Sequence, residues 1–363
     1  MRALVPVLLA LAACGPSDPV TVVTYNTGLA PNFVDGAASR TPLVGAAVAT
    51  LEADVVCLQE VWTPEDVAAV KAATEADFPH QLWPEGSQST LPDPACTEAE
   101  LGDLLDCVDR NCLDQCDEYL DDCMLDYCGI RFLTAEPSCQ GCVMANVGGE
   151  LDLIRPTCTT SYTEYAYDGA FGTAVLSKHP IVESEHIEMD ATTNRRGVHH
   201  AVVDGPAGKM DVYCTHLTAV FSVLPYPREE GDWDEEQRAQ VRTLRGIVDD
   251  TATTDQIIIL GDFNTGPAVG EDIVAEQEAS WDILQSGYTI PYVDGGGACT
   301  WCGDNPLIGE GEGHILDHVL FRGFEGGATA SRVLDEGADI QVCDEDTAGA
   351  LSDHYGVSAT LTP

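Results

Sequence analysis

Runs of apolar residues that end in polar side chains recur along the chain, and the clearest of them lies at 257–260. Four apolar residues, three of them β-branched, predict a strand that is buried on both faces. Gly261 follows, and Asp262 and Asn264 then lie two positions apart, on the same side of an extended chain. A helix cap or a turn would explain this tail equally well, because Asp and Asn favour both. Because an unpaired buried carboxylate is costly, the same pattern at several strand ends indicates a shared site instead.

The pattern predicts further strands, and a different spacing predicts the helices between them. Strands are expected at 20–25, 54–60, 172–178, 198–203, 210–214, 315–321 and after residue 354. Helices are expected where apolar residues recur three and four positions apart, at 42–53, 64–78, 234–250 and near 270–285. Because strands and helices alternate through much of the chain, we expect the α/β class with layered sheets and helices.

A cysteine-rich segment at 92–160 interrupts this alternation and indicates an insertion. Apolar residues and cysteines recur in it at helical spacing, at 101, 105, 108, 112, 116, 119, 123 and 127. One long helix, or two helices broken near Asn111, would place Cys112, Cys116 and Cys123 on one face. We expect a helical arm held by disulfides, and the sequence leaves open whether it binds an unknown partner, covers the substrate or does neither.

The first residues have the pattern of an export signal, with Arg2 before a mostly apolar run at 3–10. The run is too short to span a bilayer. Leu11-Ala12-Ala13-Cys14 resembles the bacterial lipoprotein signal, which implies that 1–13 is removed and that Cys14 carries lipid. A plain secretory signal is the alternative.

The expected order of the chain is then a signal peptide at 1–13, a tether at 14–19 and a catalytic domain at 20–363. The stretch 15–19 spans at most about 18 Å, so the domain would lie near its membrane. Gly15 is not the acidic residue that favours inner-membrane retention of such lipoproteins. This resemblance implies an outer-membrane lipoprotein or a cell-surface position, and otherwise a periplasmic or secreted protein.

The cysteine content agrees with export. Without Cys14, an even number of the 15 cysteines remains, which suits an oxidising compartment. An odd number lies between 96 and 158, so at least one of these pairs outside that segment or stays free. Cys-x-x-Cys spacing at 139/142 and 299/302 would also suit zinc, but disulfides are favoured in an exported protein.

The charge balance restricts the partners. With 61 acidic and 16 basic residues, the formal net charge is −45. A field of this sign repels polyanions, so long nucleic acids and anionic membranes are poor default partners. Most of these carboxylates are expected to form a solvated surface.

The polar residues at the predicted strand ends supply the chemistry of a metal-dependent hydrolase. Glu60 and Asn26 offer the oxygen ligands that a hard divalent cation prefers. Asp317 can orient His354 as a general base that deprotonates water. Asp262 can position the water that His354 deprotonates, Asn264 can donate to a phosphoryl oxygen, and His216 can stabilise developing charge. Taken singly, each of these residues has an ordinary explanation, for example a structural histidine or a turn.

Six short motifs resemble those of the endonuclease/exonuclease/phosphatase superfamily and occur in its order. They span about 20–361 without the cysteine-rich segment: Thr24-Tyr25-Asn26, Leu58-Gln59-Glu60, Thr215-His216-Leu217, Gly261-Asp262-Phe263-Asn264, Leu316-Asp317-His318-Val319 and Ser352-Asp353-His354. The resemblance implies a four-layer sandwich of two mixed β-sheets flanked by helices. It also implies hydrolysis of a phosphoester by in-line attack of water with Mg²⁺, or Mn²⁺ or Ca²⁺ in its place.

The resemblance also implies the residue roles. Asn26 and Glu60 are the expected metal ligands, and Asp353 a second ligand or an orienting group for the histidine. The expected catalytic residues are His216, Asp262, Asn264, Asp317, Asp353 and His354.

A stretch around Trp301 is similar to sphingomyelinases within this superfamily. Cys299-Thr300-Trp301, with Asn305 beyond it, resembles a segment before their catalytic Asp, and Arg196-Gly197-Val198 resembles part of their central sheet. The resemblance makes Arg196, Trp301 and Asn305 candidate substrate-binding residues, although Trp301 would also suit a packed loop. The acidic balance favours a small substrate or a lipid headgroup over nucleic acid. The absence of an apolar aromatic hairpin in the sequence argues against a bilayer substrate.

The sequence therefore predicts an exported, lipid-anchored Mg²⁺-dependent phosphodiesterase of the sphingomyelinase or phospholipase C kind. A secreted nuclease of the same superfamily is the first alternative, although a nuclease needs Lys and Arg around its site. The candidates for these are few: Lys178, Arg195, Arg196 and Arg228. The second alternative is a non-catalytic surface lipoprotein that binds a partner through its cysteine-rich arm.

Overall fold

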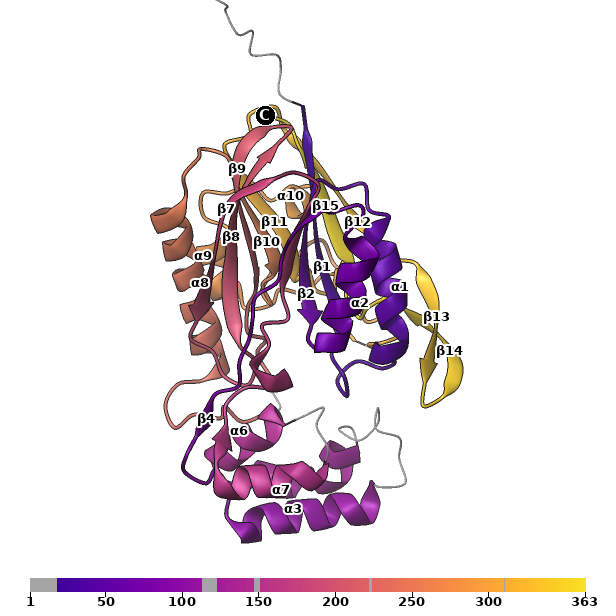
Figure 1. Ribbon diagram of the computed structural model, residues 1–363, viewed down its shortest axis with the longest axis vertical. Helices are drawn as coiled ribbons and strands as arrows, with labels where there is room; N and C mark the ends of the chain where they lie inside the picture. Colours follow the sequence, from indigo (N-terminus) through magenta and orange to yellow (C-terminus); the bar gives the residue numbers. More distant parts are fainter. Residues whose placement is uncertain (1–17, 113–122, 147–150, 222–223, 310) are drawn as a thin grey trace, which may run out of the picture.

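Two mixed β-sheets packed face to face form the centre of the molecule (Figure 1). The computed structural model describes residues 18–112, 123–146, 151–221, 224–309 and 311–363. The expected signal peptide, Cys14 and most of the expected tether lie outside these residues. Within them, no helix is long and apolar enough to cross a bilayer.

The first sheet has six strands in the order β12-β15-β1-β2-β6-β3. Their bounds are β1 Val20–Leu29, β2 Val55–Val61, β3 His80–Leu82, β6 Ala174–Ser177, β12 Ala328–Val333 and β15 Gly356–Leu361. The second sheet has five strands in the order β11-β10-β9-β8-β7. Their bounds are β7 Ile181–Met189, β8 Arg196–Gly205, β9 Gly208–His216, β10 Ile257–Asp262 and β11 Asp317–Arg322.

Helices cover the outer face of each sheet. The helices α1 (Ala37–Ala49) and α2 (Pro64–Thr74) lie on the first sheet, and α8 (Trp233–Thr251) and α9 (Glu278–Leu284) on the second (Figure 1). A short α10 (Pro291–Asp294) contacts β11 and β12, and a hairpin of β13 (Gly337–Val342) and β14 (Glu345–Ala350) extends from the domain. The predicted four-layer sandwich is therefore confirmed.

The continuous apolar runs are explained by burial on both faces. In β10, Ile258 and Leu260 belong to the core between the sheets, whereas Ile257 and Ile259 belong to the core under α8 and α9. Alternate residues of β1 divide in the same way between the central core and α1. A strand with no solvent face needs no polar position until its end, which is where the functional side chains begin.

Three predicted helices differ in extent from those observed. The helix expected at 64–78 ends at Thr74. The helix expected at 42–53 begins earlier, at Ala37, and contains Pro42. The helix expected near 270–285 is shorter and begins only at Glu278. Pro267 and Gly270 precede it in a segment held by isolated bridges, including one between Val269 and Ile273, and these residues break a helix rather than continue it.

The cysteine-rich segment forms a separate helical layer at one end of the molecule (Figure 1). It contains α3 (Glu98–Asn111), η2 (Met124–Cys128), α5 (Gly129–Leu133), α6 (Pro137–Ala145) and α7 (Leu151–Thr160). The paired short strands β4 (Thr90–Leu91) and β5 (Tyr162–Thr163) flank it in the chain. Helix α3 ends at Asn111, so the broken-helix alternative holds there. Tyr127, the last residue of the spacing found in the sequence, is 66% exposed and does not belong to the core of the segment.

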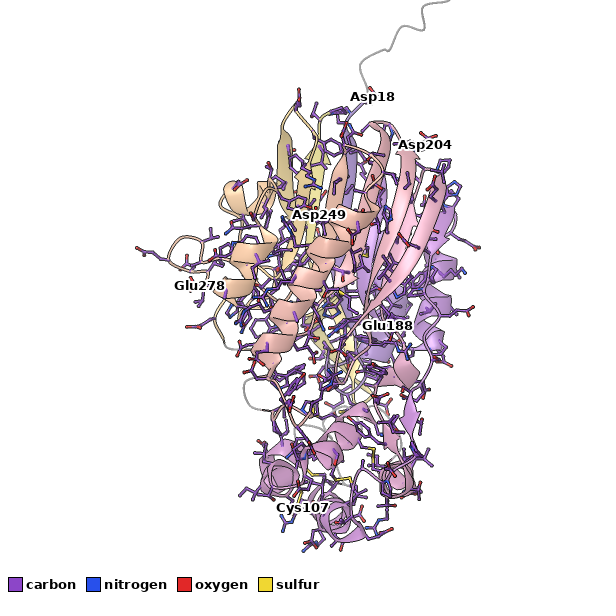
Figure 2. All side chains as sticks on the ribbon, turned by 90° about the vertical axis from the view of Figure 1, so that its left-hand side faces the viewer. Asp18, Cys107, Glu188, Asp204, Asp249 and Glu278 are labelled. Atoms are coloured by element: carbon purple, nitrogen blue, oxygen red, sulfur yellow. A yellow bond between two sulfur atoms is a disulfide. The ribbon has the colours of Figure 1, made fainter. Side chains whose placement is uncertain are left out.

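Disulfides hold this segment and also join the two sheets. Among the described residues of the segment, the bridges are Cys96–Cys139, Cys107–Cys128, Cys112–Cys123 and Cys142–Cys158. Figure 2 shows disulfides of this end of the molecule near Cys107. Cys57 of β2 is bonded to Cys214 of β9 across the central core, and Cys299 to Cys302. The zinc alternative for both Cys-x-x-Cys pairs is therefore wrong. Cys343 is disulfide-bonded as well, and Cys116 lies outside the described residues.

Two buried histidines make the fold sensitive to acid. Burial lowers the pKa of His199 to about 3 and that of His318 to about 4. The folded protein keeps both neutral, whereas the unfolded chain protonates them below about pH 6.5. The unfolded state therefore binds more protons, and the free energy of unfolding falls as the pH drops from 6.5 towards 4.

We expect each of these histidines to contribute about 1.4 kcal/mol per pH unit to this fall. Urea unfolding of wild type, His199→Gln and His318→Gln at pH 7 and pH 5 measures the contribution. Each variant should lose less stability than wild type between the two pH values. Equal losses in all three proteins would contradict the assignment.

Candidate active site

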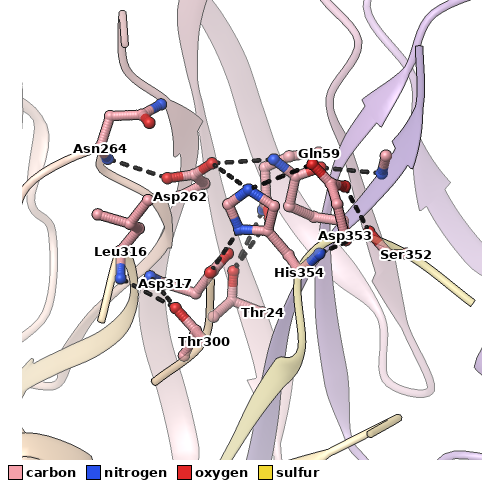
Figure 3. A network of polar contacts seen from close by, with 12 residues as sticks. Thr24, Gln59, Asp262, Asn264, Thr300, Leu316, Asp317, Ser352, Asp353 and His354 are labelled. Carbon is pink, nitrogen blue, oxygen red and sulfur yellow. Dashed lines mark hydrogen bonds and ion pairs between the residues drawn. The ribbon is translucent and has the colours of Figure 1, made fainter. Parts of the chain in front are cut away.

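The register of β10 brings three predicted catalytic residues side by side. Asp262, the last residue of β10, lies opposite His216 of the parallel neighbour β9 and opposite Asp317 of the antiparallel neighbour β11. Asp262 Oδ2 accepts a hydrogen bond of 2.9 Å from Asn26 Nδ2, and Oδ1 accepts one of 2.9 Å from the Asn264 backbone N–H (Figure 3). Asn26 belongs to β1, so this contact also joins the two sheets.

Asp262 has the electrostatics of a proton-exchanging group. Its side chain is buried, and burial followed by the neighbouring Asp317 carboxylate raises its pKa to about 7. A carboxylate with such a pKa takes up and releases a proton near neutral pH, which is common at functional sites.

Asp317 and His354 form a hydrogen-bonded dyad. His354 Nδ1 lies 2.9 Å from Asp317 Oδ2, so the other ring nitrogen is left for the cleft. That nitrogen, Nε2, lies 3.9 Å from Asp262 Oδ2 and 4.0 Å from Asp353 Oδ2. Burial alone would lower the pKa of His354, but the carboxylates of Asp317, Asp262 and Asp353 raise it well above its usual range.

Hydrogen bonds between side chains and the main chain fix the turn that carries His354 and the start of β11. Ser352 Oγ donates to the Asn26 carbonyl at 2.8 Å and accepts from the His354 backbone N–H at 3.1 Å. Asn305 Nδ2 lies 2.9 Å from the Ser352 carbonyl oxygen and 3.1 Å from that of Asp353. Thr300 Oγ1 accepts from the backbone N–H of Asp317 at 3.2 Å.

These contacts correct the prediction for Asn305. Its side chain is fully buried outside the cleft, with Oδ1 accepting from the Leu307 backbone N–H at 2.9 Å. Asn305 therefore positions the Asp353–His354 turn, and its amide is not available to a substrate.

His216 lies between Asp262, Asn264 and Glu60. Its Nε2 is 3.4 Å from Asp262 Oδ2, 3.3 Å from Asn264 Nδ2 and 3.9 Å from Glu60 Oε1. Burial, with Arg196 and His354 nearby, lowers the pKa of His216 well below its usual range, so the ring is neutral at pH 7. Asn264 also donates to the Leu217 carbonyl at 2.9 Å and has a φ of 48°, a left-handed conformation that Asn tolerates.

Glu60 and Asp353 form the acidic side of the cleft. Burial, followed by the charge of Asp353, raises the pKa of Glu60. A buried carboxylate whose charge is destabilised by a second carboxylate fits a cation, and carboxylate and amide oxygens are the ligands that Mg²⁺ prefers. Glu60, Asp353 and Asn26 therefore form a donor set suited to a divalent cation. Asp262, Asp317 and His354 also offer ligand atoms within 4.8 Å of one another, but the dyad hydrogen bond already engages two of them.

A cleft of about 440 Å³ is lined by Glu60, His216, Asp262, Asn264, Asp353 and His354. Arg196 and Trp301 also line it. The Arg196 guanidinium is buried and lies 5.8 Å from the Trp62 ring centroid. Among the described residues, its Nε and Nη1 have no hydrogen-bond partner, which suits them to an anionic ligand.

Aromatic and apolar residues complete the cleft, and the sequence analysis missed them. Trp62 and Tyr167 stack with ring centroids 5.1 Å apart, and Phe33, Met144 and Phe221 are among the other lining residues. Trp62 follows Glu60 by two positions, a spacing that could have indicated a shared face. Met144 lies in the cysteine-rich insertion, and nothing in its local pattern indicates the cleft.

The comparison with protein families decides the assignment. The model of the endonuclease/exonuclease/phosphatase family matches residues 23–354. The chain belongs to the endonuclease/exonuclease/phosphatase family. A comparison with curated proteins found no match.

Solved structures share the fold of this endonuclease/exonuclease/phosphatase chain at low sequence identity. Sphingomyelinase C from Streptomyces griseocarneus is 17% identical, with a TM-score of 0.57 over 94% of this chain and 99% of that chain. A mutant of Staphylococcus aureus beta toxin with bound magnesium ions is 13% identical, with a TM-score of 0.56 over 94% and 99%. TDP2 from C. elegans is 13% identical, with a TM-score of 0.53 over 97% and 78%. At these identities the likeness shows the fold alone.

For this family member, we expect His354→Ala to lower turnover of a phosphodiester by about 10²–10⁴-fold, because the substitution removes the general base. Steady-state kinetics with Mg²⁺ measures the effect, and near-ultraviolet circular dichroism checks the fold. His179→Ala is the matched control, since His179 pairs with Asp54 away from the cleft. Near-normal turnover in the His354 variant would refute its role.

We expect Glu60→Gln to weaken the apparent affinity for Mg²⁺ by at least about tenfold, because it removes a charged ligand. The Mg²⁺ dependence of turnover and of tryptophan fluorescence measures this affinity. Glu65→Gln, an exposed substitution in the first turn of α2, should leave it unchanged. An unaltered titration of the Glu60 variant would exclude Glu60 as a ligand.

Proposed function

We propose that the protein is an exported, metal-dependent phosphodiesterase that hydrolyses a small or lipid-headgroup phosphodiester by in-line attack of water. The observation that carries this proposal is the convergence of the Asp317–His354 dyad, Asp262 and the Glu60–Asp353 carboxylate pair on one cleft. The reaction resembles that of a sphingomyelinase or a phospholipase C.

The attacking water lies between Asp262 and His354 in this proposal. The separation of 3.9 Å between Asp262 Oδ2 and His354 Nε2 suits one water that contacts both groups. His354 Nε2 takes the water's proton, and Asp317 holds the ring orientation and stabilises the imidazolium that forms. Neutral His354 is required for this step, and a cation held by Glu60 and Asp353 would offset part of the carboxylate charge that raises the pKa of the histidine.

In this proposal the phosphoryl oxygens are held by donors from β8, β9 and the segment directly after β10. Neutral His216 and the Arg196 guanidinium, whose Nε and Nη1 have no partner among the described residues, are placed to receive them. Asn264 Nδ2 would exchange its contact with His216 Nε2 or the Leu217 carbonyl for one with the phosphoryl group. A Mg²⁺ ion held by Glu60, Asp353 and Asn26, or Mn²⁺ or Ca²⁺ in its place, would neutralise the negative charge that develops in the transition state. We infer these roles from the donor and acceptor atoms that the site offers.

The charges around the cleft favour this substrate class over nucleic acid. Among the described lining residues, Arg196 is the only Arg or Lys. Arg195 pairs with Glu188 at 3.4 Å, and Arg228 pairs with Asp190 at 2.9 Å. A nuclease needs free cations along the path of the phosphate backbone. The fold shared with Sphingomyelinase C is compatible with a lipid-headgroup diester.

Export is supported by the disulfides, which form and persist in oxidising compartments. We propose lipidation at Cys14 and a position at the outer membrane or cell surface. The non-catalytic alternative finds no support in the site, since each catalytic side chain named above is present and lines the cleft or contacts a residue that does.

A substrate panel with Mg²⁺ tests the proposal: sphingomyelin, phosphatidylcholine, a bis-aryl phosphodiester, an inositol phosphate and DNA. We expect hydrolysis of the aryl diester and of at least one phospholipid, with loss of activity in EDTA and in the His354→Ala variant. DNA cleavage as the dominant activity would favour the nuclease alternative. No hydrolysis of any substrate would refute the proposal.

A further inference from the structure

The cysteine-rich insertion contributes directly to the catalytic cleft. Helix α6 of the insertion carries Met144 one residue before its end, and the Met144 side chain lines the cleft together with His216 and Asp262. Met144 is buried in the insertion's own apolar core. A segment that lies outside the two-sheet framework therefore faces the reacting groups.

The insertion also supports the loop that follows His216. Val220, Phe221 and Leu224 line the cleft and pack on the core of the insertion. Trp233 of α8 belongs to the same core, with its ring centroid 5.2 Å from that of Phe221 and its Nε1 donating to the Leu224 carbonyl at 3.0 Å. The loop thus begins beside a catalytic histidine and is held against the insertion.

The contact between α6 and this loop is close. A Cβ added at Gly141 of α6 would lie 3.0 Å from Pro227 Cβ and 2.8 Å from the Tyr162 hydroxyl. The helix therefore needs a residue without a side chain at this position. On the far side of the loop, Arg228 forms a two-bond contact with Asp190 at 2.9 and 3.0 Å.

Disulfides fix the helix that carries Met144. Cys139 and Cys142 lie in α6, and they are bonded to Cys96 and to Cys158 of α7. Short helices with a small core gain rigidity from such bonds. A rigid surface binds a ligand without first losing conformational freedom, which favours affinity.

The surface that results is apolar. Met144, Val220, Phe221 and Leu224 offer no hydrogen-bonding side chain, whereas the neighbouring floor of the cleft carries Arg196, His216 and the carboxylates. A ligand that satisfies both parts is an amphiphile, with a phosphodiester at the floor and an alkyl or acyl chain beside it.

We propose that the cysteine-rich insertion is a specificity element, which binds the apolar chain esterified to the substrate phosphate against Met144, Val220 and Phe221. The inference rests on the proposed function and narrows its substrate class to lipid-like phosphodiesters. Met144, Val220 and Phe221 are specificity residues and take no part in proton transfer.

The binding of two ligands that differ in the length of their alkyl chain tests this inference. The ligands are octylphosphocholine and decylphosphocholine below their micelle-forming concentrations, titrated by calorimetry into the His354→Ala protein with Mg²⁺ so that no turnover occurs. Each methylene buried on the wall improves affinity by up to about fourfold. We expect decylphosphocholine to bind about tenfold more tightly than octylphosphocholine.

Variants at the wall should reduce this chain-length ratio. Met144→Gln keeps the volume and adds a polar amide, and Val220→Thr replaces one methyl group by a hydroxyl. The matched control is Ile130→Gln in α5 of the same insertion, since Ile130 is 79% exposed and away from the cleft. If Met144→Gln fails to fold, the test rests on Val220→Thr, which is a milder change in a partly exposed loop.

The results separate this inference from the proposed function. Equal affinities for the two ligands in the protein without wall substitutions would overturn the inference. An unchanged ratio of affinities in the wall variants would overturn it as well. Both conclusions hold even if the protein with His354 hydrolyses diesters. A chain-length ratio that falls in the wall variants and persists in Ile130→Gln supports it. The same ratio without hydrolysis of any diester would support an apolar ligand wall while refuting the enzymatic proposal.

Discussion

The packing of the two sheets against each other determines where every functional side chain lies. Asn26 lies in β1 of one sheet, Asp262 ends β10 in the other, and a hydrogen bond of 2.9 Å joins their side chains. Cys57 and Cys214 link the same two sheets through the core. Because β10 is apolar on both faces until its last residues, Asp262 lies at the edge where the strand ends of both sheets meet.

This arrangement concentrates negative charge that the fold alone does not compensate. Glu60, Asp262 and Asp353 line one cleft, and Asp317 is hydrogen-bonded to His354 of the same lining. Burial raises the pKa of Glu60 and of Asp262. His354 supplies one positive charge among them, and Arg196 supplies another from the substrate side. Burying these carboxylates without a bound ligand costs free energy. Such a site therefore suits a protein that binds a divalent cation together with an anionic ligand. The carboxylates in the cleft are thus explained by the binding of a cation and a ligand, whereas those on the outer surface are explained by their solvation.

Much of this site was predictable because strand burial and strand ends are local properties of the sequence. The apolar run at 257–260 predicts β10, and the residues after it predict Asp262 and Asn264 as site residues. The extent of α1 and α9 was not predictable to the same degree, because their ends depend on contacts with distant segments. Asn305 was assigned to the substrate, whereas it binds main-chain carbonyls of a turn some fifty residues away in the chain, and no spacing pattern reveals such a bond. Met144 was missed for a related reason, since only the packing of α6 against the loop after His216 brings it to the cleft.

The central claim is that the convergent side chains activate water for attack on phosphorus. Hydrolysis of a phosphodiester in water enriched in ¹⁸O, with Mg²⁺ present, tests it most directly when the products are analysed by mass spectrometry. Attack of water on phosphorus predicts one ¹⁸O atom in the phosphomonoester product and none in the alcohol. Label in the alcohol, or an absence of hydrolysis in the wild-type protein, would contradict the account.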